Sequence, residues 1–312
     1  MFESVAPQSE TGSNAIRLHR ETMARQLSVL SLMTCPELSE HRAIEFTAAE
    51  QARAITECFE GYVMPFVLDG PGFERRFRPE GLDSMASVIL KSGEEFAAIC
   101  LVARQGWTSR VAAMAIAPNF RRQGVGRRLM NLVIDEARER GDKRLVLEVI
   151  EQNPPAIGLY ESVGLSIARR LAGYRREPNS NPSESATIID PSIVIGHLAR
   201  ECSSDLPWDY KPETLAHKGS PAKGVSLSDV AFALISDTPG ERVIIWSLFT
   251  KRDSRRLGNG RKLVEAIAAM FPNKALVTPV ALPDDHAPEF LTAVGFTEVS
   301  ISQFEMAIDL NC

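Results

Sequence analysis

The 312-residue chain has little cysteine, and its cysteines form no recognisable motif. Cys35, Cys58, Cys100, Cys202 and Cys312 are odd in number and scattered along the chain. This arrangement predicts reduced thiols and a cytoplasmic protein rather than a disulfide-bonded secreted one. The sequence contains neither C-x-x-C nor H-x-x-x-H, so we expect no metal site.

Long apolar runs and an excess of positive charge are also missing. The apolar stretch Phe96–Ala103 is far too short to cross a bilayer, and residues 1–14 lack the basic start and apolar core of a signal peptide. We therefore expect no membrane partner and no export. The net charge of −5 makes a nucleic-acid partner unexpected. A chain of 312 residues with 44% hydrophobic and 24% charged residues suits two globular domains.

The most informative stretch is V-A-A-M-A-I-A-P-N-F-R-R-Q-G-V-G, residues 111–126. An apolar strand leads into a loop with two glycines, and helix-spaced apolar residues follow as far as Gly141. A helix N-terminus attracts anions, and Gly124 and Gly126 carry no side chain that would hold a phosphate off the backbone. Positive charge comes from Arg121, Arg122, Arg127 and Arg128. The stretch predicts a phosphate-binding loop; the alternative is a solvated basic helix start.

Two motifs resemble one protein family. The loop is neither a Walker motif nor a dinucleotide fingerprint, but its R-x-x-G-x-G pattern resembles the pyrophosphate loop of GNAT-superfamily N-acyltransferases. Further along, N-P-P-A-I-G-L-Y-E-S-V-G-L, residues 153–165, resembles the family's N-x-x-A-x-x-L-Y-x-x-x-G-F. Leu165 stands in place of the phenylalanine, and the preceding L-E-V at residues 147–149 also fits. The resemblance implies an α/β fold with a mixed (α+β) sheet.

The first half of the chain has the order of elements that this family implies. We expect an additional helix over 16–33, a strand at 43–46, and a helix over 48–62 that Thr47 and Glu50 cap. Residues 65–82 are turn-rich and are interpreted as a flexible lid or groove wall. Strands are expected at 84–90, 95–104, 110–117, 144–150 and 166–176, with a helix capped by Asn153 before the last of them.

The second half repeats this order after a linker rich in proline, serine and asparagine. A helix is expected from 191 to about 202, strands at 225–236 and 242–250, a second R-x-x-G-x-G before a helix, a strand at 275–280 and a helix at 288–294. We therefore predict two tandem GNAT folds. The domains are a 1–40 extension, a catalytic domain at 41–177, a linker at 178–186, and a degenerate second domain at 187–312.

The family resemblance also implies a binding site for acetyl-CoA or another acyl-CoA, without a metal. The cleft would lie where strands 111–117 and 144–150 separate, so that the backbone of Met114, Ala115 and Ile116 pairs with the pantetheine arm. The phosphates would lie on the loop, and Asn153 would both cap its helix and contact the co-substrate. The predicted loop contacts are Arg121, Arg122, Gln123, Gly124, Val125, Gly126 and Arg127.

Glu148 and Tyr160 are the candidate catalytic residues. A carboxylate inside a central strand is costly unless it is paired or faces a cleft. Glu148 is therefore either a general base with a raised pKa or the partner of an arginine that holds the sheet. Tyr160 is either the acid that protonates the departing CoA thiolate, as the resemblance implies, or an ordinary core residue.

The predicted function is direct transfer of an acetyl or other acyl group from acyl-CoA to an amine, in a ternary complex. The acceptor is a small amine or a protein N-terminus or lysine; the acidic balance favours a cationic small amine. Alternatives are a non-catalytic acyl-CoA sensor and a protein or tRNA acetyltransferase. The N-terminal motifs resemble those of ribosomal-protein N-terminal acetyltransferases. In the second half, counting back from Gly295 places Leu291, Asp284 and Pro279 at the positions of Tyr160, Asn153 and Glu148. We therefore predict that this half is catalytically inactive. Either it packs on the first half and helps to shape the acceptor groove, or it is a structural remnant.

Overall fold

The computed structural model describes residues 37–62, 66–178, 185–201, 205–219 and 221–310. The helix expected over 16–33 and most of the expected linker lie outside these residues. No helix in the described ranges is long and apolar enough to cross a membrane.

The N-terminal half places helices between strands in the expected order. Its strands are β1 (Ser39–Arg42), β2 (Val88–Ser92), β3 (Glu95–Gln105), β4 (Thr108–Ile116), β5 (Arg144–Ile150) and β6 (Ser166–Arg176). Its helices are η1 (Ala43–Glu45), α2 (Ala48–Cys58), α3 (Gly70–Phe77), η2 (Arg78–Glu80), η3 (Pro118–Phe120), α4 (Val125–Glu139) and α5 (Pro154–Glu161). The predicted capping box of Thr47 and Glu50 at the start of α2 is confirmed.

The C-terminal half repeats this order. Its strands are β7 (Thr187–Ile189), β8 (Ala222–Leu227), β9 (Ala231–Asp237), β10 (Arg242–Thr250), β11 (Ala275–Val277), β12 (Leu282–Pro283) and β13 (Thr297–Asp309). Its helices are α6 (Pro191–Glu201), η4 (Trp208–Tyr210), α7 (Pro212–Ala216), η5 (Arg252–Ser254), α8 (Asn259–Met270) and α9 (Pro288–Ala293).

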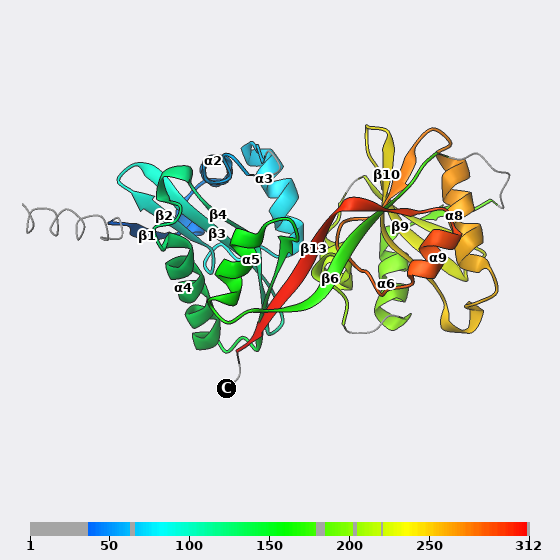
Figure 1. Cartoon of the computed structure of the whole chain (residues 1–312). Helices are drawn as coiled ribbons and strands as arrows, with labels where there is room; N and C mark the ends of the chain where they lie inside the picture. Colours follow the sequence, from blue (N-terminus) through cyan, green and yellow to red (C-terminus); the bar gives the residue numbers. More distant parts are fainter. Residues whose placement is uncertain (1–36, 63–65, 179–184, 202–204, 220, 311–312) are drawn as a thin grey trace, which may run out of the picture.

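The two halves share one continuous mixed sheet through an exchange of strands. The strand order is β1-β2-β3-β4-β5-β13-β6-β11-β10-β9-β8-β7. β6 follows α5 in the chain but pairs with β11 of the C-terminal half. β13 follows α9 but pairs with the whole length of β5, from Gln303 opposite Ile150 to Asp309 opposite Arg144. These two long strands, which also pair with each other, connect the halves in Figure 1.

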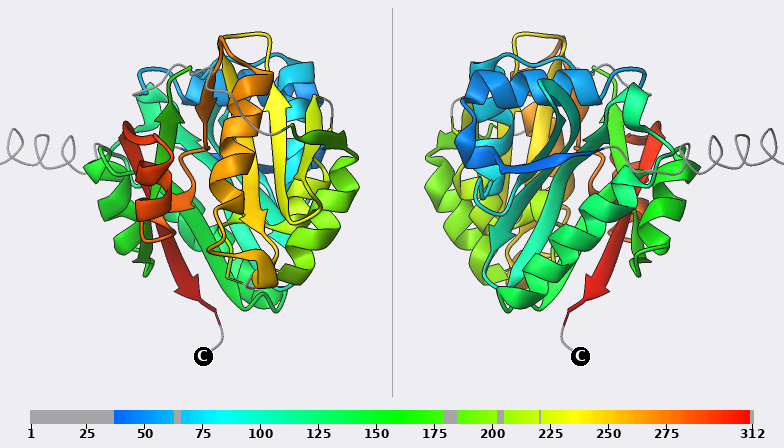
Figure 2. Two further views of the ribbon diagram at one scale, coloured as in Figure 1. Left: turned by 90° about the vertical axis from the view of Figure 1, so that its right-hand side faces the viewer. Right: turned by 90° about the vertical axis from the view of Figure 1, so that its left-hand side faces the viewer.

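The two faces of the N-terminal sheet are covered differently. Helices α2 and α4 lie over one face (Figure 2), where they bury side chains such as Ile55 and Leu129 together with Leu147 of β5. On the opposite face Trp208, which belongs to the C-terminal half, packs against Val146 and Ala307. Because successive residues of a strand point to opposite faces, Glu148 shares the Trp208 face with Val146.

Several expected elements differ in the structure. The segment 43–46, expected as a strand, contains the short helix η1, and the helix expected to reach residue 62 ends at Cys58. Residues 65–82, expected to be a lid, contain α3, because Asp69 accepts a hydrogen bond from the Gly72 amide at 2.7 Å and Pro71 occupies the first turn. The strand expected over 225–236 is the hairpin of β8 and β9, and the one expected to reach residue 280 ends at Val277.

Candidate active site

The parallel strands β4 and β5 separate part-way along their length. Their pairing runs from Thr108 opposite Arg144 to Val111 opposite Leu147 and then stops. β4 nevertheless continues to Ile116 and β5 to Ile150. The outer edges of the two strands are occupied by β3 and β13. The inner edges, which include the backbone of Met114, Ala115 and Ile116, thus face a gap in which an extended ligand arm can pair as an added strand does.

The glycine-containing loop leads directly into α4 beside this gap. Gly124 is the N-cap residue with φ 81°, a left-handed conformation that favours glycine, and no side chain caps the helix. The amides of Val125, Gly126 and Arg127 in the first turn are therefore available to an anion. A Cβ on Gly126 would lie 3.0 Å from the Leu159 side chain. This glycine thus also allows α5 to pack closely against α4.

Arg121 is directed at the protein rather than at the loop's exterior. Its Nε donates to the carbonyl oxygen of Ile116 at 2.8 Å, and its Nη2 donates to those of Cys58 and Glu60. Arg121 therefore ties the end of β4 to the C-terminus of α2, where carbonyl oxygens collect partial negative charge. Among the other predicted loop contacts, the side chains of Arg122, Gln123 and Arg127 are exposed and that of Val125 is buried.

The second R-x-x-G-x-G sequence adopts the same conformation. Gly258 has φ 82° and Arg256 has φ 60°, against 81° for Gly124 and 59° for Arg122. Arg255 donates through Nε to the Thr250 carbonyl at 3.1 Å and through Nη2 to the Glu201 carbonyl at 3.3 Å. The repetition predicted from sequence is therefore also a repetition of backbone conformation and of the arginine's contacts.

The other expected counterparts in the C-terminal half have different surroundings. Leu291 is buried in the core of that half, and Asp284 lies 3.5 Å from the guanidinium of Arg170. Pro279 lies two residues beyond the end of the short strand β11 and has no backbone N–H to offer a ligand.

Glu148 is held in a buried ionic network. Its carboxylate accepts a hydrogen bond from Nε of Arg110 on β4 at 2.7 Å, while Nη1 of Arg110 contacts Glu80 at 2.6 Å. Glu80 also pairs with Arg76 of α3. The side chains of Glu148 and Arg110 are only 10% and 6% exposed. The ion pair that the sequence left as an alternative is thus present.

The electrostatic surroundings of Glu148 nevertheless favour a role for this side chain as a proton acceptor. Burial is the largest influence and raises the pKa of Glu148, whereas the Arg110 guanidinium opposes this rise. The carboxylates of Asp209 and Glu305 add to the rise. A carboxylate with a raised pKa is a stronger base than an ordinary glutamate, and it lies on β5 immediately beyond the last residue paired with β4.

Tyr160 lies on the other face of the sheet. It belongs to the buried cluster that contains Leu147 and Val149, whereas Glu148 points away from that cluster. No group in the described part of the chain hydrogen-bonds the Tyr160 hydroxyl. Burial raises the pKa of this hydroxyl above its ordinary value, so it carries its proton at neutral pH. Asn153 caps α5 as predicted, accepting from the Ala156 amide at 3.4 Å.

The C-terminal half borders the Glu148 network. Trp208 donates through Nε1 to the carbonyl oxygen of Glu80 at 3.0 Å, and its ring lies 5.9 Å from the Arg110 guanidinium. The neighbouring Asp209 has a buried Oδ1 without a hydrogen-bond partner in the described residues. The sequence contained one signal for the Arg110–Glu148 ion pair: these residues carry opposite charges and lie in two strands predicted to be neighbours.

Comparison with known proteins supports the N-terminal assignment. Residues 52–165 match the model of the acetyltransferase (GNAT) family. This segment, which is less than half of the chain, is therefore similar to the GNAT family. It includes the loop, the β4–β5 gap, Glu148 and Tyr160. Within the described residues, no group of three or more His, Cys, Asp or Glu side chains is arranged to hold a metal ion.

Two curated relatives resemble part of the chain. The [ribosomal protein bS18]-alanine N-acetyltransferase of Escherichia coli K12 is 41% identical over 76 residues, which are 24% of this chain and 50% of that protein. The streptothricin acetyltransferase of Streptomyces lavendulae is 36% identical over 89 residues, 28% of this chain and 47% of that protein. The chain thus spans about half the length of the curated relatives it matches.

A solved structure resembles the whole fold. The tandem GNAT protein from the clavulanic acid biosynthesis pathway superposes with a TM-score of 0.62 at 16% identity, over 88% of this chain and 99% of that one. The fold is therefore a tandem GNAT fold with a mixed α/β sheet, as predicted.

Proposed function

We propose that the N-terminal GNAT domain transfers an acetyl group from acetyl-CoA to an amine. The observation that carries this proposal is the gap between β4 and β5, with the uncapped start of α4 at one end, Glu148 on one face and Tyr160 on the other. The exchange of β6 and β13 keeps the proposed domains, 41–177 and 187–312, in one assembly. The buried free thiols of Cys58 and Cys100 accord with a cytoplasmic location.

The residues of the gap have complementary binding roles in this proposal. Acetyl-CoA supplies an acetyl group activated as a thioester. The backbone of Met114–Ile116 holds its extended arm, and the first-turn amides of α4 hold its phosphates, assisted by Arg122, Gln123 and Arg127. Arg121 positions the loop through its carbonyl contacts rather than through a phosphate. Asn153 fixes the start of α5, which carries Tyr160.

Proton transfer is divided between the two faces. Glu148 accepts a proton from the acceptor's ammonium group on the face that Trp208 covers. Tyr160 donates its hydroxyl proton to the sulfur that leaves on the helix face. Arg110 keeps part of the Glu148 population ionised, because its charge opposes the effect of burial.

The acceptor is an amine whose site lies beside the C-terminal half. One relative is named for the N-terminal alanine of a ribosomal protein and the other for streptothricin, so a protein N-terminus and a small amine are both consistent with the family. The carboxylates near Glu148 favour a cationic small amine. The C-terminal half acts without catalytic residues of its own, by placing Trp208 and Asp209 against this site.

A panel of amines tests the proposal. Release of CoA from acetyl-CoA is measured with polyamines, aminoglycoside-type antibiotics and peptides beginning with alanine, and the products are identified by mass spectrometry. We expect amine-dependent CoA release that Glu148→Gln lowers by about 10²-fold or more. The Glu148–Arg110 ion pair favours one rival, a non-catalytic acyl-CoA sensor. Binding of acetyl-CoA without release by any amine would support that rival.

A further inference from the structure

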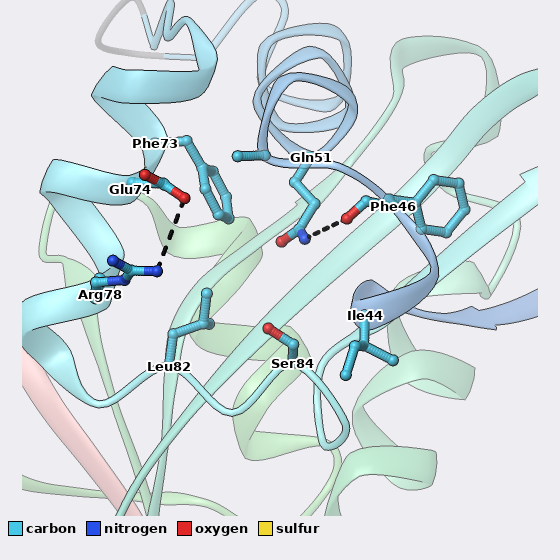
Figure 3. A pocket seen from close by; sticks show the side chains of 9 residues that line it. Ile44, Phe46, Gln51, Phe73, Glu74, Arg78, Leu82 and Ser84 are labelled. Atoms are coloured by element: carbon cyan, nitrogen blue, oxygen red, sulfur yellow. Dashed lines mark hydrogen bonds and ion pairs between the residues drawn. The ribbon is translucent and has the colours of Figure 1, made fainter.

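A second pocket lies in the N-terminal half between α2, α3 and the segment that follows η2 (Figure 3). Its volume is about 380 Å³, within the usual range for small-molecule sites. Phe46, Phe73 and Leu82 supply apolar walls. The paired side chains of Glu74 and Arg78 lie at its border, with 3.9 Å between their charged atoms, so the border has no net charge.

The amide of Gln51 presents an acceptor to this pocket. Its Nε2 donates to the carbonyl oxygens of Ala43 at 2.9 Å and Phe46 at 3.0 Å. These two bonds define the orientation of the amide, because the reversed amide would place its oxygen against two carbonyl oxygens. The Oε1 atom is buried and has no hydrogen-bond partner among the described residues. The residue as a whole is only 6% exposed. Figure 3 shows this oxygen facing the space between Phe73, Leu82 and Ser84.

The pocket is separate from the β4–β5 gap. Its α2 residues, Ala48 and Gln51, belong to the first turn of that helix, whereas Arg121 of the loop contacts the carbonyl of Cys58 at the other end. Eleven helical residues separate these ends by about 16 Å. None of the pocket's lining residues belongs to the candidate active site.

We propose that this pocket binds a small uncharged molecule that has an apolar ring and an N–H donor. The ring packs between Phe73, Phe46 and Leu82, and the N–H donates to Oε1 of Gln51. A buried acceptor whose orientation is fixed selects strongly for a donor, since a ligand without one leaves the oxygen unpaired. The apolar walls and the balanced border charges disfavour an ionic ligand.

Titration calorimetry of the full chain tests this site with indole as the probe. 1-Methylindole is the matched control, because it keeps the ring system and lacks the N–H. We expect saturable binding of one indole per chain and at least about fivefold weaker binding of 1-methylindole, the value of one hydrogen bond. Absence of saturable indole binding, or equal affinity for the two probes, would overturn the proposal.

Two protein variants locate the binding. Ala48→Phe fills the pocket without removing a hydrogen bond and should abolish indole binding. Ala49→Phe places the same side chain at the next, exposed position of α2, outside the lining, and should retain it. Circular dichroism establishes that both variants are folded. Equal indole binding by both would show that the probe binds elsewhere, and the comparison of the two probes on the unmodified chain does not depend on either variant.

Discussion

Replacing Arg110 by methionine should move the pH dependence of acyl transfer. The Arg110 guanidinium donates to Glu148 at 2.7 Å and favours its ionised form. A hydrogen bond between charged groups contributes about 1.5–3 kcal/mol. Loss of Arg110 removes this contribution from the ionised form and should therefore raise the pKa of Glu148 further.

The sign of the effect follows from the role of Glu148. A base must be ionised to accept a proton, so the acidic limb of the kcat/KM profile reports the pKa of Glu148. This limb should lie above the pKa of an unperturbed glutamate, about 4.3, and should move to still higher pH in Arg110→Met. The same shift has a consequence for stability. The pKa of Glu148 is higher in the folded state than in the unfolded state, so the folded state binds more protons between these two pKa values. The free energy of unfolding therefore falls as pH rises through this range.

The assay is the pH profile of kcat/KM with the best acceptor from the amine panel. Arg169→Met is the control, because Arg169 pairs with Glu305 at 3.0 Å on the same face and has no bond to Glu148. It should move the acidic limb far less. If Arg110→Met folds poorly, Arg110→Lys is measured in its place. Because lysine keeps the charge, this variant should shift the acidic limb in the same direction by a smaller amount. An unchanged limb, or one at lower pH, in Arg110→Met would refute the assignment of Glu148 as the titrating base.

Four further substitutions separate catalysis from structure. Tyr160→Phe should lower kcat by about 10²-fold or more and leave the calorimetric affinity for acetyl-CoA unchanged, because it removes a proton and keeps the ring; an unchanged kcat would assign Tyr160 to the core alone. Arg121→Met and Arg255→Met should both lower Tm, because each loses its contacts with backbone carbonyl oxygens. Only Arg121→Met should weaken acetyl-CoA binding, and equal weakening by both would contradict an inactive second half. Trp208→Ala should lower the free energy of unfolding by about 3–5 kcal/mol in denaturant titrations. It should also slow acyl transfer, because Trp208 holds Glu80 through a hydrogen bond. Unchanged stability would show that the segment around Trp208 does not pack against the N-terminal half in solution.

Local features of the fold could be predicted because local residues determine them. The capping box of Thr47 and Glu50 and the cap at Asn153 depend on neighbours within a few residues. The helix α3 was missed although its signal was present: Asp69 followed by proline two positions later marks a helix start as well as a turn.

Long-range features could not be predicted from one sequence. Nothing near residues 297–309 indicates that β13 pairs with β5 rather than within its own half, because the pairing depends on which edges of the sheet remain open. The direction of Arg121 depends on carbonyls more than sixty positions away at the end of α2. The contact of Trp208 with Glu80 likewise joins residues 128 positions apart. Motifs therefore located the candidate site, and tertiary packing determined which of its charges are paired.

The most direct test of the account compares turnover by two double variants with the same acceptor. One carries Glu148→Gln with Tyr160→Phe, and the other carries Arg255→Ala with Gly258→Ala. If the N-terminal GNAT domain performs the chemistry, the first should lose nearly all amine-dependent release of CoA, and the second should retain most of it. Substantial turnover by the first together with loss of turnover in the second would place the reaction in the C-terminal half and contradict the proposal.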